Sequence, residues 1–362
     1  MGATRVLVVD DSVVVRKLVT DVINAEDDLE VAGTAPNGRI ALAKVNDLAP
    51  DVVTLDVEMP DMNGIEALRG LRSSHPRLPV VMFSTLTERG AQITLEALML
   101  GAKDYVTKPA NVGSVTEAKE AVRAELVPKL RSLSGKPETM RKAAAAAPRR
   151  PAVGRPAAPP AKPAGPVEVV VFGVSTGGPN ALAKVMPALP GDLGVPVLVV
   201  QHMPPLFTGL LAGRLDAASP LDVAEASDGL RPKPGQVLVA PGDHHLEVGS
   251  RGGMPILHTT KGPLENSCRP AADVLFRSAA KVYGGGVLGV VLTGMGHDAL
   301  RGAKDVVEAG GRVIAQDEAT SVVWGMPGAL VEAGLAHAVL PLDGVADEVA
   351  RRVAASAKAG AR

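Results

Sequence analysis

The residues best placed to do chemistry lie in the segment Gly173-Val174-Ser175-Thr176-Gly177, directly after the apolar run 167–172. A serine at a sharp turn between a strand and a helix is often a nucleophile, because the glycines leave its hydroxyl exposed at the edge of the sheet. Small-residue turns of this kind are common, so the segment alone does not establish catalysis. A nucleophilic serine also needs a base, and usually an acid that orients the base.

His202 is the best candidate for the base, because it follows the apolar run 195–201. If that run forms a strand beside the one that precedes Ser175, two parallel strands end side by side and bring both residues within reach. The alternative is a histidine that is merely satisfied at the end of a strand. The remaining histidines are His75, His244, His245, His258, His297 and His337.

Asp298 is the candidate acid, since it follows the apolar run 287–292 in a glycine-containing loop that opens onto a helix. It could cap that helix, or it could orient His202 and stabilise its protonated form. His297 is a rival base, but a direct neighbour of the acid points in a different direction from a residue that the acid holds. The order serine, histidine, acid differs from the order in lipase-like hydrolases.

His244 and His245 stand in the turn-like segment Pro241-Gly242-Asp243-His244-His245. We expect this segment to border the cleft, either as a contact to substrate or as a structural turn.

Three carboxylates near the amino terminus form a second candidate site. Asp10 and Asp11 end the first predicted strand and Asp56 ends the third, so a doubly wound sheet would gather all three at its carboxyl edge. Such a cluster repels itself and calls for a cation, and hard oxygen ligands suit Mg²⁺. Asp10 and Asp11 could each be a helix cap when taken singly, but their joint placement with Asp56 favours a metal site.

Two further residues complete this second site. Lys108, followed by Pro109 after the fifth strand, supplies a positive charge, and Ser84 at the end of the fourth strand supplies a hydroxyl. With the metal and Lys108 neutralising a transferring phosphoryl group, Asp56 could accept that group.

The elements that must position these residues alternate between apolar strand-like runs and amphipathic helical runs. This alternation predicts α/β domains, each a doubly wound parallel sheet covered by helices. Asp11-Ser12 is predicted to begin the first helix. The predicted strands are 6–9, 30–34, 52–55, 80–83 and 104–106 in the first region, and 167–172, 195–200, 236–240, 287–292 and 312–316 in the second.

The segment 134–166 is mostly Ala, Pro, Lys and Arg and cannot bury a core, so it is predicted to be a linker. Its basic residues favour a solvated spacer over a dedicated anion site. The expected organisation is a first domain over 1–131, a flexible linker over 132–166 and a second domain over 167–355.

The overall composition excludes several classes of function. With 38 basic and 39 acidic residues among 362, nothing points to nucleic acid or to an anionic membrane surface. No run approaches the length of a membrane span, and no signal-peptide pattern precedes the first strand. Cys268 is the single cysteine, which suits a reducing cytoplasm and is interpreted as a small buried or half-buried side chain.

The first region resembles the receiver domains of bacterial response regulators over about residues 4–131, including the acidic pair, the segment Leu55-Asp56-Val57-Glu58-Met59-Pro60, Ser84, Tyr105 and Lys108-Pro109. The resemblance implies a flavodoxin-like fold in which Asp11, Asp56 and the main-chain carbonyl of Glu58 bind Mg²⁺, with Asp10 helping through water. It also implies that Ser84 and Tyr105 move when Asp56 is phosphorylated, and that the Lys108–Pro109 bond is cis.

The second region resembles the CheB family of chemotaxis protein-glutamate methylesterases over about residues 167–353. The resemblance depends on the serine turn, Gln201-His202-Met203-Pro204, the Gly-Met-Gly-x-Asp segment and Arg269-Pro270-Ala271-Ala272-Asp273-Val274-Leu275-Phe276. It implies a Rossmann-like domain in which Ser175, His202 and Asp298 form the triad. Thr176 then lies beside the nucleophile, and the backbone N–H of Met295 helps to form the oxyanion hole.

The two resemblances together imply a cytoplasmic response regulator that removes methyl groups from glutamyl esters of chemotaxis receptors and deamidates receptor glutamines. A chemotaxis histidine kinase would be the phosphodonor, Mg²⁺ would serve the first domain only, and neither nucleic acid binding nor insertion into a membrane is expected. The alternative is a phosphorylation-controlled scaffold whose second domain has kept the fold without the activity.

Overall fold

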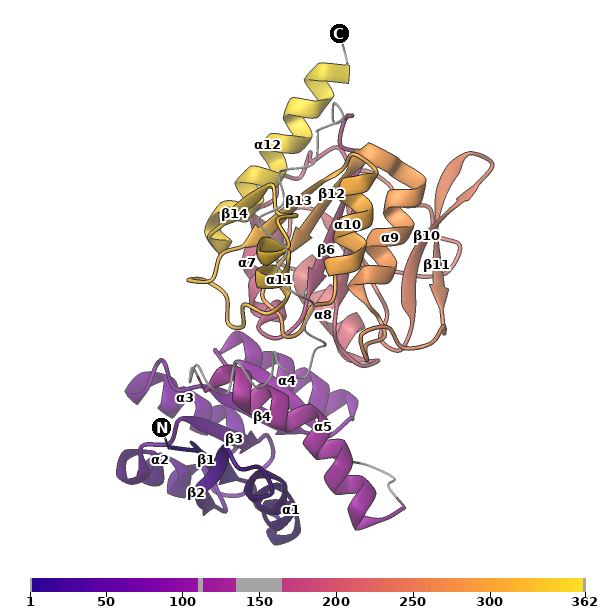
Figure 1. Cartoon of the computed structure of the whole chain (residues 1–362). Helices are drawn as coiled ribbons and strands as arrows, with labels where there is room; N and C mark the ends of the chain where they lie inside the picture. The colour runs from indigo at the N-terminus through magenta and orange to yellow at the C-terminus, as the bar shows by residue number, and fades with distance from the viewer. Residues whose placement is uncertain (1, 110–112, 135–164, 361–362) are drawn as a thin grey trace. The chain divides into compact units, whose positions relative to one another are not determined.

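The computed structural model describes residues 2–109, 113–134 and 165–360, and of residues 356–360 the backbone alone. The chain divides into two compact units, residues 1–150 and 151–362, which are described separately (Figure 1). Most of the predicted linker 132–166 lies outside the described residues. The boundaries predicted at 131 and 167 therefore remain predictions.

The first unit contains a parallel sheet in the order β2-β1-β3-β4-β5, which is the flavodoxin-like order. All five strands predicted in this region are confirmed. The strands are β1 (Thr4–Val9), β2 (Leu29–Ala35), β3 (Val52–Asp56), β4 (Val80–Ser84) and β5 (Asp104–Thr107), and the helices are α1 (Val13–Asn24), α2 (Gly38–Leu48), α3 (Gly64–Ser74), α4 (Glu88–Met99) and α5 (Val115–Leu133).

Polar side chains fix where helices of the first unit begin. Ser12 caps α1, its hydroxyl oxygen accepting a hydrogen bond from Val15 N, which confirms the predicted helix start. Asn63 and Glu66 form a reciprocal capping box at the start of α3. These local bonds satisfy backbone N–H groups that have no partner within their own helix.

The second unit contains a seven-stranded parallel sheet in the order β14-β13-β12-β6-β7-β9-β8. Five of these strands match the predictions. They are β6 (Val169–Val174), β7 (Val197–Gln201), β9 (Gln236–Val239), β12 (Val287–Val291) and β13 (Arg312–Gln316). The edge strands β8 (Asp222–Glu225) and β14 (Ala338–Leu340) were not predicted, because they are short and bury little apolar surface.

An antiparallel hairpin, β10 (His245–Arg251) and β11 (Met254–Thr260), was also not predicted. Its strands are joined by Gly252-Gly253, both with positive φ, which matches a two-residue hairpin turn. The hairpin packs on α9 (Ala272–Tyr283), where Ser278 Oγ accepts a hydrogen bond from Val248 N at 3.0 Å.

The remaining elements of the second unit are helical. They are α7 (Gly178–Val185), η1 (Met186–Ala188), α8 (Phe207–Asp216), η2 (Gly284–Gly286), α10 (Leu300–Glu308), α11 (Met326–Glu332) and α12 (Leu342–Gly360). Helices α9 and α10 pack against each other, and so do α7 and α12 (Figure 1). None of the described helices has the length and apolar composition that crossing a membrane would require.

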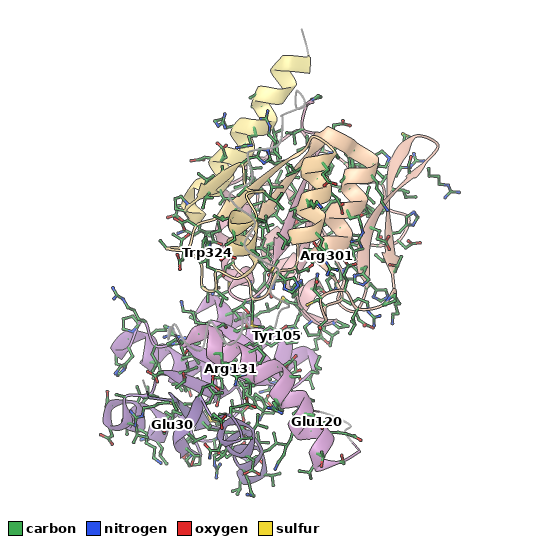
Figure 2. The ribbon with its side chains drawn as sticks, in the orientation of Figure 1. Glu30, Tyr105, Glu120, Arg131, Arg301 and Trp324 are labelled. Atoms are coloured by element: carbon green, nitrogen blue, oxygen red, sulfur yellow. The ribbon has the colours of Figure 1, made fainter. Side chains whose placement is uncertain are left out.

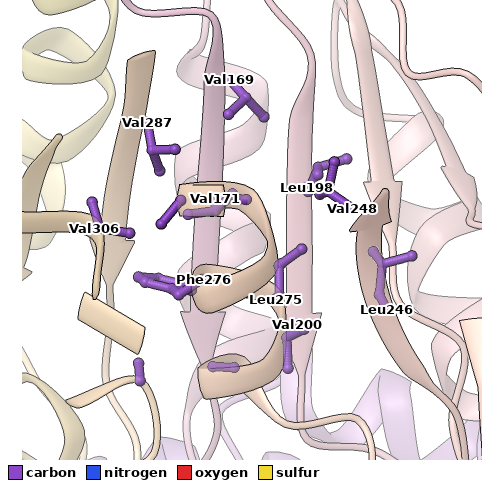
Figure 3. Packing of buried hydrophobic residues seen from close by; sticks show 14 of the residues in the cluster. Val169, Val171, Leu198, Val200, Leu246, Val248, Leu275, Phe276, Val287 and Val306 are labelled. Carbon is purple, nitrogen blue, oxygen red and sulfur yellow. The ribbon is translucent and has the colours of Figure 1, made fainter. Parts of the chain in front are cut away.

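The central strands of the second unit are buried along their whole length. Val171 on β6 and Leu198 on β7 pack with Leu275 and Phe276 of α9 in one apolar cluster (Figure 3). Strands covered on both faces are selected for continuous apolar sequence, which is why the sequence predicted them well. This core holds β12, β6 and β7 side by side, so their carboxyl ends form one edge of the sheet.

Candidate functional site

Ser175 lies directly after β6, at the start of the turn into α7. Its backbone N–H donates to Thr293 O at 3.1 Å, and its carbonyl accepts from Gly178 N at 2.7 Å, closing a tight turn. Gly177 has φ = +78°, a conformation that disfavours any residue with a Cβ. The sequence therefore places a half-buried hydroxyl at the carboxyl edge of the sheet.

His202 and Asp298 meet at the same edge, although they are far apart in the chain. His202 follows β7, Asp298 follows β12, and His202 Nε2 lies 2.7 Å from Asp298 Oδ2. Both side chains are largely buried, with exposures of 13% and 2%. Burial disfavours both charges, but it is outweighed by the shared hydrogen bond together with the contact of His202 with Cys268 and the backbone donors to Asp298. The pKa of His202 is therefore raised and that of Asp298 is lowered to about 2.

Three other donors hold the Asp298 carboxylate. Oδ2 accepts from Ala272 N at 2.6 Å, and Oδ1 accepts from Asp273 N at 3.0 Å and from Asn266 Nδ2 at 2.7 Å. The two backbone groups belong to the first turn of α9, whose dipole favours a negative charge. Asp298 thus orients His202, as one of the two interpretations predicted, and does not cap α10, whose first turn it does not bond.

The second ring nitrogen of His202 faces the single cysteine. Cys268 Sγ lies 3.6 Å from His202 Nδ1, and the thiol is half-buried as expected. The contact itself was not predicted. Within the described residues no hydrogen bond joins Ser175 Oγ to His202; catalytic hydrogen bonds often become short only when substrate is bound.

The loop after β12 borders the nucleophile. A Cβ added to Gly294 would stand 2.9 Å from Ser175 Cβ, so only glycine lets the backbone approach this closely. Thr293 Oγ1 ties the loop to the serine turn by donating to Thr176 O at 2.9 Å. Gly294 N donates to Val323 O at 2.9 Å, beside Trp324 (Figure 2). Met295, the predicted oxyanion residue, is therefore on a braced loop next to Ser175.

The other histidines of this unit do not join the pair. His297 is exposed, and among the described residues no hydrogen bond joins it to Asp298. This agrees with the expectation that a direct neighbour of the acid points away from the residue that the acid holds. His245 uses both ring nitrogens in structural bonds, Nε2 with Pro263 O at 2.9 Å and Nδ1 with Ala271 N at 3.2 Å. His244 Nδ1 contacts Gly242 O at 3.2 Å. The turn interpretation thus fits His245 better than a contact to substrate.

Gln201 is a residue that sequence reasoning missed as part of the site. Its Nε2 donates to Ser175 O at 3.0 Å and to His202 O at 3.3 Å, and the side chain is buried. One amide thereby joins the two segments that carry the nucleophile and the base. The polar residue that ends an otherwise apolar strand, directly before His202, was the available signal.

The first unit brings its predicted carboxylates together at the carboxyl ends of β1 and β3. One oxygen each from Asp10, Asp11 and Asp56 lies within 4.8 Å of the others. Lys108 Nζ contacts Asp10 Oδ2 at 2.9 Å and Asp56 Oδ2 at 2.8 Å. Burial and the neighbouring Asp10 raise the pKa of Asp56 to about 6 despite Lys108.

This carboxylate cluster fits a hard divalent cation. Asp10 and Asp56 are buried, and the ammonium group of Lys108 lies between them, so the two carboxylates carry more negative charge than Lys108 neutralises. The atoms that could coordinate a cation here are carboxylate oxygens, which are hard ligands. An open hollow of about 750 Å³, lined by Asp11, Glu58 and Arg89 among others, gives access from solvent.

The predicted switch residues are both buried, Ser84 at the end of β4 and Tyr105 on β5. Ser84 accepts a hydrogen bond from Thr94 Oγ1 at 2.7 Å, and Tyr105 (Figure 2) packs inside, with Lys129 Nζ 5.1 Å from its ring centre. Their movement on phosphorylation stays a prediction. The cis bond expected at Lys108–Pro109 is wrong: the cis bond of the described residues is Arg269–Pro270, and trans is the more stable form of most X–Pro bonds.

Comparison with known proteins gives two family matches. A family described as CheB methylesterase matches residues 170–349, and one described as response regulator receiver domain matches residues 6–120. A protein-glutamate methylesterase/protein-glutamine glutaminase of Nocardioides sp. is 53% identical over 98% of this chain and 96% of its own length. A protein of the same name from Trichodesmium erythraeum is 47% identical over 98% of this chain and 100% of its own.

A solved structure is also similar to part of this chain. The CheB methylesterase catalytic domain of Thermotoga maritima is 44% identical and has a TM-score of 0.50. The match covers 51% of this chain and 98% of that domain.

Proposed function

The chain belongs to the CheB methylesterase family, and from this premise we propose that Ser175, His202 and Asp298 hydrolyse glutamyl methyl esters of chemotaxis receptors. The observation that supports this most is the 2.7 Å pair His202–Asp298, which three neighbouring parallel strands bring to the edge that carries Ser175. The protein is a phosphorylation-regulated protein-glutamate methylesterase, and the same site deamidates receptor glutamines.

Acylation begins when Ser175 Oγ attacks the ester carbonyl carbon. Because Asp298 occupies Nε2 of His202, the proton of the hydroxyl goes to Nδ1, the nitrogen that Cys268 Sγ also contacts at 3.6 Å, and Asp298 stabilises the imidazolium that forms. The tetrahedral oxyanion is stabilised by the backbone N–H of Met295, next to Thr176 and the serine turn. The C–O bond to the methoxy group then breaks, His202 returns the proton, and methanol leaves.

Deacylation reverses the roles. Water loses a proton to His202 and attacks the acyl carbon, the bond to Ser175 Oγ breaks, and the serine recovers its proton as the receptor leaves with a glutamate side-chain carboxylate. A glutamine carboxamide follows the same course with ammonia as the leaving group, so one acyl-enzyme serves both reactions. Every protein group that these steps require belongs to the chain itself.

The first unit supplies the regulatory reaction. Asp56 attacks the phosphorus of a donor, a chemotaxis histidine kinase in this proposal, and the bond from phosphorus to the donor breaks as an acyl phosphate forms. Asp11, Asp56 and the carbonyl of Glu58 would hold Mg²⁺, with Asp10 acting through water, and the cation would neutralise charge on the transferring group. Lys108 already contacts Asp56 and adds a second positive charge. We place the protein in the cytoplasm with the kinase.

The proposal is tested by methanol release from a methylated receptor peptide together with labelling of the serine by a fluorophosphonate. Wild-type protein should release methanol and become labelled, and Ser175→Ala should do neither. A folded wild-type protein that shows neither reaction would favour the alternative, a phosphorylation-controlled scaffold.

A further inference from the structure

We propose that Asn266 is a positioning residue for the triad acid: its side-chain amide fixes the orientation in which Asp298 holds His202. The inference deepens the proposed function and rests on it. Asn266 Nδ2 donates to Asp298 Oδ1 at 2.7 Å and also to Asp273 Oδ2 at 2.9 Å. One NH₂ group therefore joins two carboxylates.

The two carboxylates need such a link because both are buried. Asp298 is 2% exposed and Asp273 is 0% exposed. Burial and the repulsion from Asp298 raise the pKa of Asp273, although Gly302 N donates to it at 2.7 Å. A neutral amide supplies one N–H to each carboxylate without adding a charge, which neither an acid nor a hydrophobic residue could do at this place.

The bond from Asn266 decides which oxygen faces the base. Asp298 Oδ1 accepts from Asn266 and from Asp273 N, while Oδ2 accepts from His202 and from Ala272 N. Without the amide, Oδ1 keeps a single donor at 3.0 Å and the carboxylate is freer to rotate away from His202. The main loss would be in the chemical step rather than in substrate binding, because Asn266 bonds the acid and not the substrate.

The backbone presets the amide for this role. Residues 265–268 form a tight turn in which Cys268 N donates to Glu265 O at 2.9 Å and Glu265 N donates to Cys268 O at 3.2 Å. Both central residues have positive φ, +52° at Asn266 and +62° at Ser267, a conformation that asparagine tolerates better than most residues. Arg277 clamps the turn through two bonds to Glu265, at 3.0 and 2.7 Å.

The same turn also reaches the base, because Cys268 Sγ lies against His202 Nδ1. A purely structural role for Asn266, that of filling a left-handed turn position, would leave the ionisation of His202 unaffected. The two roles therefore differ in their effect on the pH dependence of activity.

Several charged or titratable groups surround Asn266 and Asp298. They are His202, His245, Glu265, Cys268, Asp273, Arg277 and Arg301.

Asn266→Asp is the decisive variant, because it keeps the shape and makes the donor depend on pH. When protonated, the new carboxyl can donate one hydrogen bond to a neighbouring carboxylate; when ionised, it repels both. We expect its kcat/KM relative to wild type to fall by about tenfold per pH unit above its own pKa. Asn266→Ala should lower the plateau value of kcat, reached at high pH, by about ten- to a hundredfold, with KM nearly unchanged.

Ser267→Asp is the matched control, since it adds the same charge to the exposed neighbouring position of the same turn. It should keep the wild-type pH profile. All variants are full-length chains, with thermal unfolding recorded for each. If Asn266→Ala does not fold, Asn266→Asp at low pH still decides the question. A wild-type pH profile for Asn266→Asp overturns the proposal.

A readout without turnover separates this inference from the proposed function. The pKa of His202 is followed by NMR, with His202→Gln used to assign the signal. We expect Asn266→Ala to lower that pKa toward its ordinary value, because the carboxylate is no longer held against the ring. An unchanged His202 pKa refutes the role of Asn266 even if the protein is active. A lowered pKa in a protein that releases no methanol refutes only the esterase proposal.

Discussion

Replacing Asp298 by Asn tests the central pair of the site most directly. All four groups around the carboxylate are donors: His202 Nε2, Asn266 Nδ2, Ala272 N and Asp273 N. An asparagine offers one acceptor oxygen and one NH₂ group, so two of these donors would face another donor. The substitution removes the negative charge and part of the hydrogen bonding without changing the size of the side chain.

The size of the effect follows from the pKa of Asp298, which is lowered from 3.8 to about 2 although burial opposes the charge. A shift of roughly two units corresponds to about 2–3 kcal/mol of net stabilisation of the carboxylate. This net value already includes the cost of burying the charge, so the attraction of the carboxylate to His202 and the other donors is larger than the net value. We therefore expect kcat/KM for methanol release to fall by about a hundredfold or more, yet by less than in Ser175→Ala.

The pH profile gives a second, independent measure. His202 must be neutral to act as a base, so activity rises with pH through the pKa of His202, which lies above 6.5 in the wild type. Without the carboxylate, the pKa of His202 falls. In Asp298→Asn the ascending limb of the plot of activity against pH should therefore move to lower pH, and the plateau of activity should be lower than in the wild type.

The same pair affects stability. The lowered pKa of Asp298 stabilises the fold above pH 3.8, and this contribution is lost as pH falls toward about 2. The raised pKa of His202 stabilises the fold below pH 6.5, and this contribution is lost as pH rises through the folded-state value. Both contributions are fully present between pH 3.8 and pH 6.5, so the unfolding free energies of wild type and Asp298→Asn should differ most in this range.

The control is Glu308→Gln at the end of α10, an exposed acid that pairs only weakly, with Lys304 at 3.6 Å. It should behave like the wild type in both assays. An Asp298→Asn variant that keeps wild-type kcat/KM, or whose ascending limb moves to higher pH, would show that the reasoning about the pair is wrong.

Three further outcomes are expected. Gln201→Ala leaves Ser175 O and His202 O without their shared donor and should cost about 1–3 kcal/mol of stability along with most of the activity; calorimetry and methanol release check this, and unchanged values for both would contradict a bracing role. Asp56→Asn should abolish labelling by acetyl phosphate, whereas undiminished labelling would place the phosphoacceptor elsewhere. A fragment over 166–362 should turn over faster than the unphosphorylated whole chain, because the first unit is tethered at high local concentration; a folded fragment that is no faster would argue against inhibition by occlusion.

Much of the fold was accessible from the sequence because buried parallel strands are continuous apolar runs. The runs before Ser175 and His202 were predicted as strands for this reason, and both are confirmed as β6 and β7. The end of a strand also fixes which residue stands at the sheet edge, so the sequence alone was enough to group Asp10 with Asp56. The short edge strands and the hairpin gave no comparable signal.

Which side chains contact one another was decided only by the tertiary structure. Strand order brings together the ends of β6, β7 and β12, and with them Asp298 and His202, which are 96 residues apart in the chain. The turn that carries Asn266 reaches Asp298 across 32 residues, and local periodicity contains no information about such a contact. The sequence could therefore supply the chemical groups and the edge of the sheet at which they lie. The packing of α9 and the 265–268 turn against that edge determines which oxygen of Asp298 faces His202, because hydrogen-bond direction depends on the relative placement of distant backbone segments.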